Sequence, residues 1–395
     1  MDILMIAQYI GDIESISGNN NRFPYLANLL SCHNQVEVLT SDFNHMAKKH
    51  FLFADQRVEY KVIMMHESGY PKNVCIKRLI SHKELAKNIN RYLIQRKRAD
   101  LIYCAIPSID VAYVAARYAK RNKIKFIIDI QDLWPEAFRL VFNIPMISNI
   151  IFAPMIKKAD YIYNNADEIV AVSETYLNRV FRVNKIGKGL TVYLGTEREH
   201  FDRYANTAVQ DNHDGKVKLA YVGTLGSSYD ISVIIDALKL LDQSFLDKLQ
   251  FIIMGNGPKK EHFEKEASGL PVIFTGVLPY PEMVKKLVSC DIAINPICRG
   301  AAQSIINKHM DYAMAGLPVI STQECEEYRG LLEKYGCGIN CECGNAKEVA
   351  DAIKLLILNS DLRRQMGIYS RRMAEDLFDR TKSYNKIEKL ISSEV

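Results

Sequence analysis

Short apolar segments alternate with helical patterns along most of this chain, and this alternation limits its fold more than any other feature. Residues 2–7 and 36–40 are apolar runs of strand length, and residues 22–30 between them have the spacing of an amphipathic helix. The same order returns later, where the run 216–222 precedes a helical pattern over 231–241. Strands joined through helices pair in parallel, so we predict an α/β fold with parallel sheets.

Length and composition describe an ordinary globular protein with two domains. The 395 residues fit two domains better than one, and residues 196–215 lose apolar periodicity as a linker does, so we expect a boundary near 200. A net charge of +5 is too modest and dispersed to indicate nucleic-acid binding. The nine cysteines lack the spacing of a disulfide framework, and neither a signal peptide nor an apolar membrane span is evident. We therefore expect a cytoplasmic protein.

A helical pattern that begins near Gln303 is the centre of the predicted site. It follows the apolar run 291–297, so the helix starts at the carboxyl end of a strand, where open α/β sheets bind ligands and helix N–H groups favour anions. Gln303, Asn307 and Asp311 are four residues apart and share one face, with Lys308 beside Asp311. This face suits a ligand with hydroxyls and phosphates; a capped, solvated helix face is the alternative.

Glycine follows the strands expected in the second half. Gly223, Gly255 and Gly276 end apolar runs, and Gly226 and Gly257 come close behind. Glycine between a strand and a helix lets a nucleotide approach the backbone, although one such turn alone is a weak signal. Their joint occurrence predicts that this half binds a nucleotide.

The first half carries two further candidate regions. The long loop 11–22 follows the first strand; there Gly18 and Asn19 can let the backbone approach a ligand and Arg22 can meet a phosphate, unless the loop is only a flexible connection. Later, Asp129 and Asp132 accompany the only Trp at the end of another strand, where binding groups concentrate, although one Asp could simply cap a helix.

Basic residues dominate one predicted helix. Eight Lys and Arg between Lys77 and Arg98 face the single acid Glu84. Such a pattern is usually a solvated face, but it is also the face that an enzyme of membrane lipids would turn toward anionic headgroups.

The apolar segment 141–156, broken by two prolines, is expected to form core helices, with a lipid-facing segment as the alternative. A zinc site at Cys337, Cys341 and Cys343 is not expected, because it has three thiols and no nearby His.

Taken together, the chain resembles the family-4 retaining glycosyltransferases of GT-B fold, and in particular bacterial enzymes that assemble capsule, O-antigen and colanic-acid-type polysaccharides. The resemblance rests on motifs in a fixed order: Asp132-Leu-Trp-Pro-Glu136, Tyr221-Val-Gly-Thr-Leu-Gly226, Gly255-Asn-Gly-Pro258, Phe274-Thr-Gly-Val-Leu-Pro279, Asn307-Lys-His-Met-Asp-Tyr312 and Gly316-Leu-Pro-Val319. It implies two Rossmann-like domains facing across a cleft. These are an acceptor-binding domain over 1–200, a nucleotide-sugar-binding domain over 201–369, and a final helix within 370–395 that crosses back to the first domain.

The resemblance implies the transfer of a hexosyl or N-acetylhexosaminyl unit from a nucleoside-diphosphate sugar, expected to be a UDP-sugar, to a glycan hydroxyl with retention. We expect a polyprenyl-pyrophosphate-linked acceptor, an enzyme bound peripherally to the inner face of the cytoplasmic membrane, and no cofactor, metal or nucleic acid. Two alternatives stay open, a nucleotide-sugar 2-epimerase and a non-catalytic GT-B partner subunit.

By resemblance, Asp311 would hold the ribose and Gln303 the donor sugar, at positions where the family carries glutamates. The family's diphosphate-binding Arg and Lys fall on Thr224 and Tyr229, and its first-domain histidine falls on Gln131. Because Gln303 cannot act as a nucleophile, front-face attack is favoured, with Lys308 stabilising the departing phosphate. We predict Lys308, Gln303 and Asp132 as catalytic. The predicted substrate contacts are Gly18, Asn19, Arg22, Asp129, Gly223, Thr224, Gly226, Gly255, Gly257, Val277, Leu278, Arg299, Ser304, Ile305, Ile306, Asn307 and Asp311.

Overall fold

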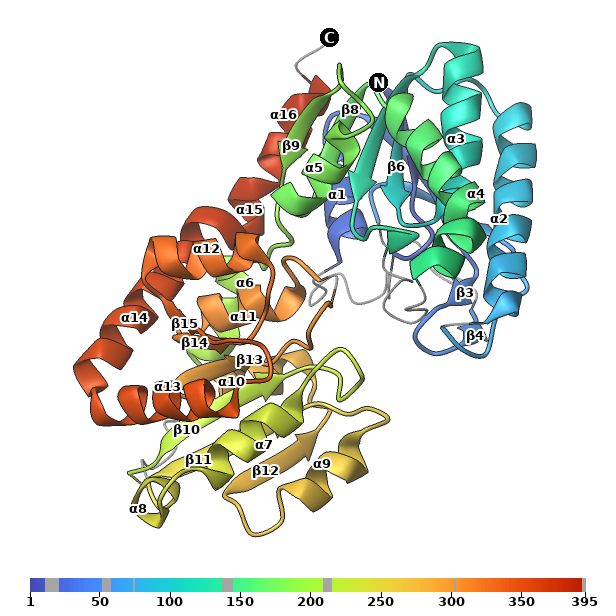
Figure 1. Ribbon diagram of the computed structural model, residues 1–395. Coiled ribbons are helices and arrows are strands. Elements are labelled where there is room, and N and C mark those ends of the chain that lie inside the picture. The colour runs from blue at the N-terminus through green and yellow to red at the C-terminus, as the bar shows by residue number, and fades with distance from the viewer. Residues whose placement is uncertain are drawn as a thin grey trace. The chain divides into compact units, whose positions relative to one another are not determined.

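The computed structural model describes residues 1–10, 21–51, 58–73, 75–136, 145–208, 215–301 and 303–392. The chain forms two compact units, one of Met1–Tyr193 with Tyr384–Val395, and one of Leu194–Ser383. A parallel sheet lies at the centre of each unit and carries helices along it (Figure 1). The predicted α/β class with two parallel sheets is therefore confirmed.

Seven parallel strands form the sheet of the first unit, in the order β5-β2-β1-β6-β7-β8-β9. Their bounds are β1 Asp2–Ile6, β2 Gln35–Ser41, β5 Lys61–Met65, β6 Leu101–Ile106, β7 Lys125–Ile130, β8 Glu168–Ala171 and β9 Lys188–Thr191. In the register, Ile3 lies opposite Val36 of β2 on one side and Leu101 of β6 on the other. The strand order reverses between β1 and β6, so their carboxyl ends frame the position where such sheets bind ligands.

Helices of the first unit lie on both sides of this sheet, with α2, α3 and α4 packed side by side (Figure 1). The bounds are α1 Arg22–Ser31, α2 Ile76–Gln95, α3 Ile109–Asn122, α4 Pro145–Asn164, α5 Glu174–Phe181 and α16 Asn385–Ser392, and a short antiparallel hairpin joins β3 Phe43–Asn44 to β4 Lys49–His50. Ile387 and Ile391 of α16 are buried in one core with Leu26 and Leu30 of α1. The last helix thus belongs to the first unit, as the fold prediction required.

Six parallel strands form the sheet of the second unit, in the order β12-β11-β10-β13-β14-β15. Their bounds are β10 Val217–Val222, β11 Leu249–Met254, β12 Val272–Gly276, β13 Ile292–Asn295, β14 Val319–Ser321 and β15 Gly338–Asn340. The helices are α6 Arg198–Ala205, α7 Ile231–Lys239, α8 Gln243–Leu246, α9 Lys260–Glu266, α10 Tyr280–Val288, α11 Asn307–Met314, α12 Glu326–Tyr335, α13 Ala346–Leu358 and α14 Ser360–Met373. Here the order reverses between β10 and β13, so the second ligand position lies where these two strands end.

Two sequence expectations need correction. The segment taken for a linker contains α6, which buries Phe201 completely and packs against α10. The final helix, expected as one piece, is divided into α14, the π-helix η2 (Ala374–Phe378), α15 (Arg380–Ser383) and α16. Among the described residues, none of the helices is both long and apolar enough to cross a membrane.

Candidate functional site

Lys308, the second residue of α11, has an unusual environment for a charged side chain. The residue is 6% exposed, and its Nζ has no hydrogen-bond partner within the described part of the chain. The rings of Tyr221 and Tyr229 lie 4.1 and 3.8 Å from Nζ, and burial lowers the pKa of this amine well below its ordinary value. Aromatic faces offset only part of the cost of burying an ammonium. An anion beside Nζ would supply the missing partner.

Gly223 lies directly against Lys308, at the turn that follows β10. A Cβ on Gly223 would come within 3.2 Å of the Lys308 Nζ, and the glycine has a φ of +141° that other residues rarely adopt. Lys308 therefore lies beside the reversal point between β10 and β13, where parallel sheets bind ligands. We call Lys308, Gly223, Tyr221 and Tyr229 the Lys308 site.

Two other predicted glycines have a packing role in the structure. A Cβ on Gly255 would lie 1.8 Å from the carbonyl oxygen of Gly223, and one on Gly257 would lie 2.4 Å from that of Leu225. The turns after β10 and β11 can therefore touch only because both positions lack a side chain. Gly226 differs, since its added Cβ would meet nothing closer than Thr224 Cγ2 at 3.5 Å.

Asp311 faces a different set of groups from Lys308. Its Oδ1 accepts hydrogen bonds from the Tyr280 hydroxyl at 3.0 Å and from Thr196 Oγ1 at 3.5 Å. Burial raises the pKa of its carboxyl from 3.8 to about 7, although these two bonds and the charge of Arg380 act in the opposite direction. No ion pair joins Asp311 to Lys308 among the described residues. The two side chains were predicted to lie beside each other on one helix face, but they contact different groups.

Gln303 precedes the helix instead of lying on it, because α11 begins at Asn307. An amide network positions this segment: Gln323 Nε2 donates to the carbonyl oxygens of Gln303 and Ser304 at 2.8 and 2.7 Å, and Asn295 Nδ2 donates to Gln323 Oε1 at 2.9 Å. The Gln303 Oε1 is buried without a partner in the described structure. Sequence reasoning missed Asn295 and Gln323. The only signal was their position, because Asn295 ends the buried strand β13 and Gln323 follows the buried strand β14.

The other predicted contacts of the second unit lie at the same sheet edge. Arg299 is 67% exposed and lies 3.5 Å from Glu342 and 3.8 Å from Glu324, so its proposed role with phosphate competes with two carboxylates. Asn307, the first residue of α11, and Thr224, in the turn after β10, are both exposed. The remaining positions are Val277 (exposed), Leu278 and Ile306 (half-buried), and Ser304 and Ile305 (buried).

In the first unit, Arg22 and Asp129 belong to the core and not to an open site. Arg22 Nε lies 2.7 Å from Asp129 Oδ2, and the two side chains are 2% and 0% exposed. Tyr103 and Gln131 donate to the same carboxylate at 2.5 and 2.7 Å, and the Arg22 guanidinium lies 4.8 Å from the centre of the Tyr384 ring. These contacts use Arg22 Nε and both Asp129 oxygens, while Arg22 Nη2 is buried without a hydrogen-bond partner among the described residues. Gly18 and Asn19 lie outside the described residues.

A chain of polar side chains crosses the carboxyl edge of the first sheet in strand order. Glu67, two residues after β5, accepts from Ser41 at the end of β2 and from Gln8 after β1, at 2.5 and 2.9 Å. Ser108, after β6, donates to the Gln8 amide oxygen. Ser81 of α2 donates to the second Glu67 oxygen at 2.5 Å. These hydrogen bonds link the ends of β5, β2, β1 and β6, next to the position between β1 and β6 where such sheets bind ligands.

Asp132 and Trp134 extend this edge toward α2. Trp134 Nε1 donates to Asp132 Oδ2 at 3.1 Å, and burial raises the pKa of the Asp132 carboxyl. The indole stacks on His82 with ring centres 5.7 Å apart, and the Arg78 guanidinium lies 4.4 Å from the Trp134 ring. Sequence reasoning missed His82 and took Arg78 for a surface charge. The signal was their place on the apolar side of the helical pattern, with His82 one turn and Arg78 two turns before Leu85 and Ala86.

Five of the eight basic residues lie on α2 and three follow it directly, and two of the eight are used inside the protein. Arg78 is 8% exposed, and Arg96 lies 3.0 Å from both Asp2 and Glu37. The other six basic residues are exposed, namely Lys77, Lys83, Lys87, Arg91, Lys97 and Arg98. The face expected to meet lipid headgroups is therefore smaller than the sequence suggested.

Comparison with known proteins shows which family the second unit matches and which fold the whole chain shares. Residues 202–373 match the family "Glycosyl transferases group 1". Over 190 residues the chain is 24% identical to a GDP-mannose-dependent alpha-(1-6)-phosphatidylinositol dimannoside mannosyltransferase of Mycobacterium tuberculosis, covering 47% of this chain and 48% of that protein. The chain thus spans about half the length of the curated relatives it matches.

Solved structures similar to the whole chain include HepE of Anabaena in complex with UDP, at a TM-score of 0.69 and 16% identity with 100% of both chains covered. Sucrose-phosphate synthase from Thermosynechococcus elongatus has a TM-score of 0.74 at 14% identity, over 100% of this chain and 99% of that one. WaaG, a glycosyltransferase involved in lipopolysaccharide biosynthesis, has a TM-score of 0.68 at 13% identity, over 99% of both. The GT-B fold expected from the sequence is confirmed.

Alanine substitution at two glycines should separate packing from ligand contact. Gly255→Ala should lower the free energy of unfolding by more than about 2 kcal/mol, because its Cβ would overlap the Gly223 carbonyl. Gly226→Ala should change stability by less than about 1 kcal/mol and still weaken nucleotide binding if this turn meets the phosphates. Urea unfolding and calorimetry with UDP measure the two effects. Unchanged UDP affinity in Gly226→Ala would remove this turn from the site.

Asp311→Asn should alter both stability and binding. Because the folded carboxyl has its pKa raised to about 7, its burial costs nothing below about pH 4 and destabilises the fold increasingly as the pH rises toward 7. The variant should therefore have a larger free energy of unfolding than the wild type at pH 8, by up to about 4 kcal/mol, and should match the wild type near pH 4. It should also bind UDP more weakly. Parallel pH profiles for the two proteins would contradict this account of Asp311.

Proposed function

We propose that this protein transfers a sugar from a nucleoside-diphosphate sugar, with a UDP-sugar as the expected donor, to a hydroxyl of a lipid-linked glycan. The observation that carries the proposal is the buried Nζ of Lys308, which lacks a hydrogen-bond partner in the described structure and lies against the Gly223 turn. A diphosphate is the anion that would meet this need at a nucleotide position. The group 1 match over residues 202–373 supports the reaction class, and the UDP complex of HepE supports the nucleotide.

The proposed chemistry is front-face displacement with retention. The bond between the anomeric carbon and the diphosphate oxygen breaks, the acceptor oxygen bonds to that carbon from the same side, and the acceptor proton passes to the departing phosphate. Bound diphosphate would favour the protonated form of Lys308, and the ammonium would then stabilise the charge that grows on the leaving group. Gln303, an amide, would orient the donor sugar and cannot form a covalent glycosyl ester.

The first unit would supply the acceptor side. A hollow of about 560 Å³ opens between the β3–β4 hairpin and α2, and its lining combines apolar Phe43, Tyr70 and Ile80 with the cations Lys48 and Lys77. This combination suits an amphiphile that carries phosphate, such as a polyprenyl-pyrophosphate-linked glycan. Asp132 would contact the acceptor hydroxyl. A larger hollow of about 760 Å³ lies at the amino ends of β7, β8 and β9, the edge opposite to the one that binds ligands in such folds, so we assign it no role in transfer.

The proposed function is tested by a donor screen followed by a transfer assay. UDP-sugars and GDP-sugars are first compared by thermal shift, in which a ligand at a hundred times its dissociation constant stabilises by about 2.7 kcal/mol. Stabilising donors are then incubated with polyprenyl-pyrophosphate-linked saccharides, and the lipid products are analysed by mass spectrometry. Transfer is expected. Conversion of the donor without acceptor would indicate an epimerase, and binding without turnover would indicate a non-catalytic subunit.

Replacement of Lys308 tests the proposed leaving-group role. Lys308→Met should lower turnover by about 100-fold or more and weaken donor binding less, because phosphate charge develops as the glycosidic bond breaks. Stability should be kept or increased, since an apolar chain replaces a buried amine between two tyrosines. Lys285→Met is the control and should behave as wild type, because Lys285 on α10 is half-buried and pairs with Glu282 at 3.0 Å. Equal losses in affinity and turnover would argue for ground-state binding only.

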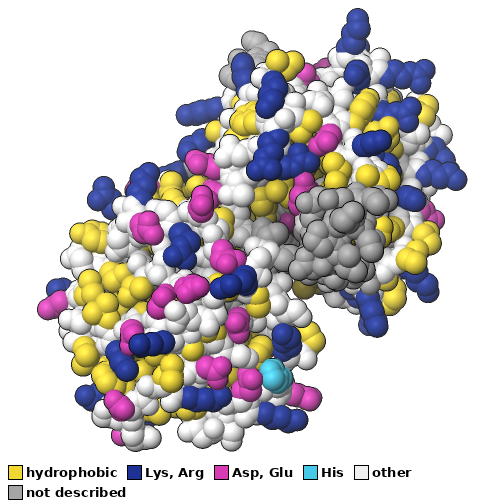
Figure 2. All heavy atoms as spheres, viewed as in Figure 1, with side chains coloured by type: hydrophobic (Ala, Val, Ile, Leu, Met, Phe, Trp, Pro, Cys, Tyr) yellow, Lys and Arg dark blue, Asp and Glu magenta, His cyan; other side chains and the backbone are white. Residues whose placement is uncertain are grey.

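We also propose that the protein works at the inner face of the cytoplasmic membrane through α2. Lys and Arg side chains are frequent along the side of the first unit that α2 occupies (Figure 2). Four of the six exposed cations lie on α2, and Ile76 and Ile80 of the same helix are 76% and 56% exposed, so α2 combines charge with apolar side chains that could enter a lipid interface. Each basic residue near an anionic surface contributes about 1 kcal/mol.

Vesicle binding tests this membrane proposal. The wild type should bind vesicles that contain anionic lipid at low salt and release them as salt rises, because charges are screened within about 8 Å at physiological ionic strength. The triple change Lys83→Glu, Lys87→Glu and Arg91→Glu should abolish binding and leave UDP affinity intact. The matched control reverses Arg364 and Arg372, which are 78% and 74% exposed on α14. Equal loss in the control, or no binding by the wild type, would refute the proposal.

A further inference from the structure

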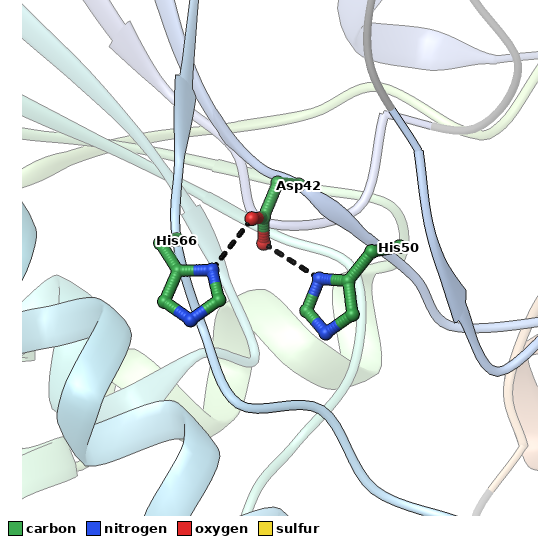
Figure 3. A group of neighbouring side chains, drawn as sticks. All are labelled: Asp42, His50 and His66. Carbon is green, nitrogen blue, oxygen red and sulfur yellow. Dashed lines mark hydrogen bonds and ion pairs between the residues drawn. The ribbon is translucent and has the colours of Figure 1, made fainter.

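Three potential metal ligands meet outside the candidate site. Asp42 directly follows β2, His50 ends β4, and His66 directly follows β5. Within the described residues their ligand atoms, one from each side chain, all lie within 4.8 Å of one another. Figure 3 shows both imidazole rings below the carboxylate, each with a nitrogen turned toward it. We call these three residues the Asp42 cluster.

The distances in the Asp42 cluster are close to those of a metal site. His66 Nδ1 lies 2.7 Å from Asp42 Oδ2, and His50 Nδ1 lies 3.3 Å from Asp42 Oδ1. In a tetrahedral zinc site, ligands about 2.0 to 2.2 Å from the ion lie roughly 3.3 to 3.6 Å from one another. Movements of less than about 1 Å would therefore let one ion replace the two nitrogen-to-oxygen contacts. The two rings are nearly parallel, at 23°, with their centres 5.4 Å apart.

The backbone holds the ligands in this arrangement. The Asp42 N–H donates to the Met65 carbonyl at 2.9 Å, and the Asp42 carbonyl accepts from Phe51 N–H at 2.9 Å. The Glu67 N–H donates to Asp42 Oδ1 at 3.1 Å. The segments that carry His50 and His66 are thus tied to Asp42 by the neighbours of each histidine. The imidazoles remain 45% and 60% exposed, so an ion can reach them.

We propose that Asp42, His50 and His66 bind one Zn²⁺ or a similar divalent transition-metal ion, through one carboxylate oxygen and the two Nδ1 atoms, with water completing the coordination. Two imidazoles and a carboxylate form a ligand set that suits zinc and its neighbours, whereas calcium and magnesium prefer oxygen ligands alone. The competing explanation is that Asp42 holds the two imidazoles by hydrogen bonds. No sequence motif indicated the cluster, because its members lie on three segments. His50 is eight residues after Asp42, and His66 is sixteen residues after His50.

The ion would join the β3–β4 hairpin to the end of β5. Phe43, Lys48 and His50 of this hairpin line one wall of the hollow that also contains Tyr70 and Ile80. A bound ion would therefore stabilise that wall, whatever ligand the hollow accepts. Since metal binding can be measured without donor or acceptor, this inference stands or falls separately from glycosyl transfer.

Calorimetry with Zn²⁺ on the full chain, after removal of metal by EDTA, tests the inference. One ion per chain should bind, and His50→Gln or His66→Gln should each lower the affinity at least about tenfold. The control is His262→Gln, because His262 lies 3.3 Å from Glu266 and is exposed, but belongs to no group of three potential metal ligands within the described residues. The control should bind as wild type. Zn²⁺ should also raise the melting temperature of the wild type more than that of either cluster variant.

Protection from chemical modification provides a second measurement on the unaltered protein, in case a variant fails to fold. Zn²⁺ should shield His50 and His66 from diethylpyrocarbonate and leave His262 reactive. Absence of Zn²⁺ binding by the wild type would overturn the inference. Equal weakening by His262→Gln, or protection of His262 alone, would do the same, because binding would then arise from ordinary surface histidines.

Discussion

Parallel strand pairing is the constraint on which the rest of this structure depends. Every ladder within the two large sheets is parallel, so each connection must return across a face of the sheet before the next strand begins. All carboxyl ends of a unit therefore meet at one edge, and the polar residues that follow the strands meet there too. In the first unit this edge gathers Ser41, Gln8, Glu67 and Ser108 into one hydrogen-bonded chain. Residues up to 100 positions apart become neighbours without any motif in the sequence.

The same edge of the second unit carries two ionisable groups whose burial opposes folding. Lys308 has aromatic rings but no hydrogen-bonding partner in the described structure, and Asp311 has hydroxyl donors but no ion-pair partner. Stability alone would favour apolar side chains at both positions. Shifted protonation at a ligand-binding edge is typical of functional sites, where a ligand later supplies the missing charge. The two side chains face different neighbours, which fits a ligand with chemically distinct ends, such as a diphosphate and a ribose.

Local pattern was enough to predict most strands of the two sheets, the two-unit organisation and the glycine turns, but it did not indicate β5, β14 or β15. Strand length and apolar runs are properties of neighbouring residues, and glycine marks the places where backbone segments touch. Pattern was less informative about why a glycine is needed. Gly255 and Gly223 both follow strands, yet the first makes room for a neighbouring carbonyl and the second for a lysine. Only the spatial pairing of β10 with β11 and α11 distinguishes these roles.

The errors of sequence reasoning share one physical cause, which is pairing between distant segments. Arg22 follows a loop that suggested phosphate binding, but its partner Asp129 lies 107 residues away and pairs with it inside the core. Gln303 seemed to share a helix face with Asp311, but the helix starts at Asn307, and hydrogen bonds from Gln323 to the carbonyls of Gln303 and Ser304 hold the segment that precedes it. A charged or amide side chain can satisfy either a ligand or a remote part of its own chain. The sequence shows which chemical group is present, whereas the fold determines whether a ligand or another part of the chain lies next to it.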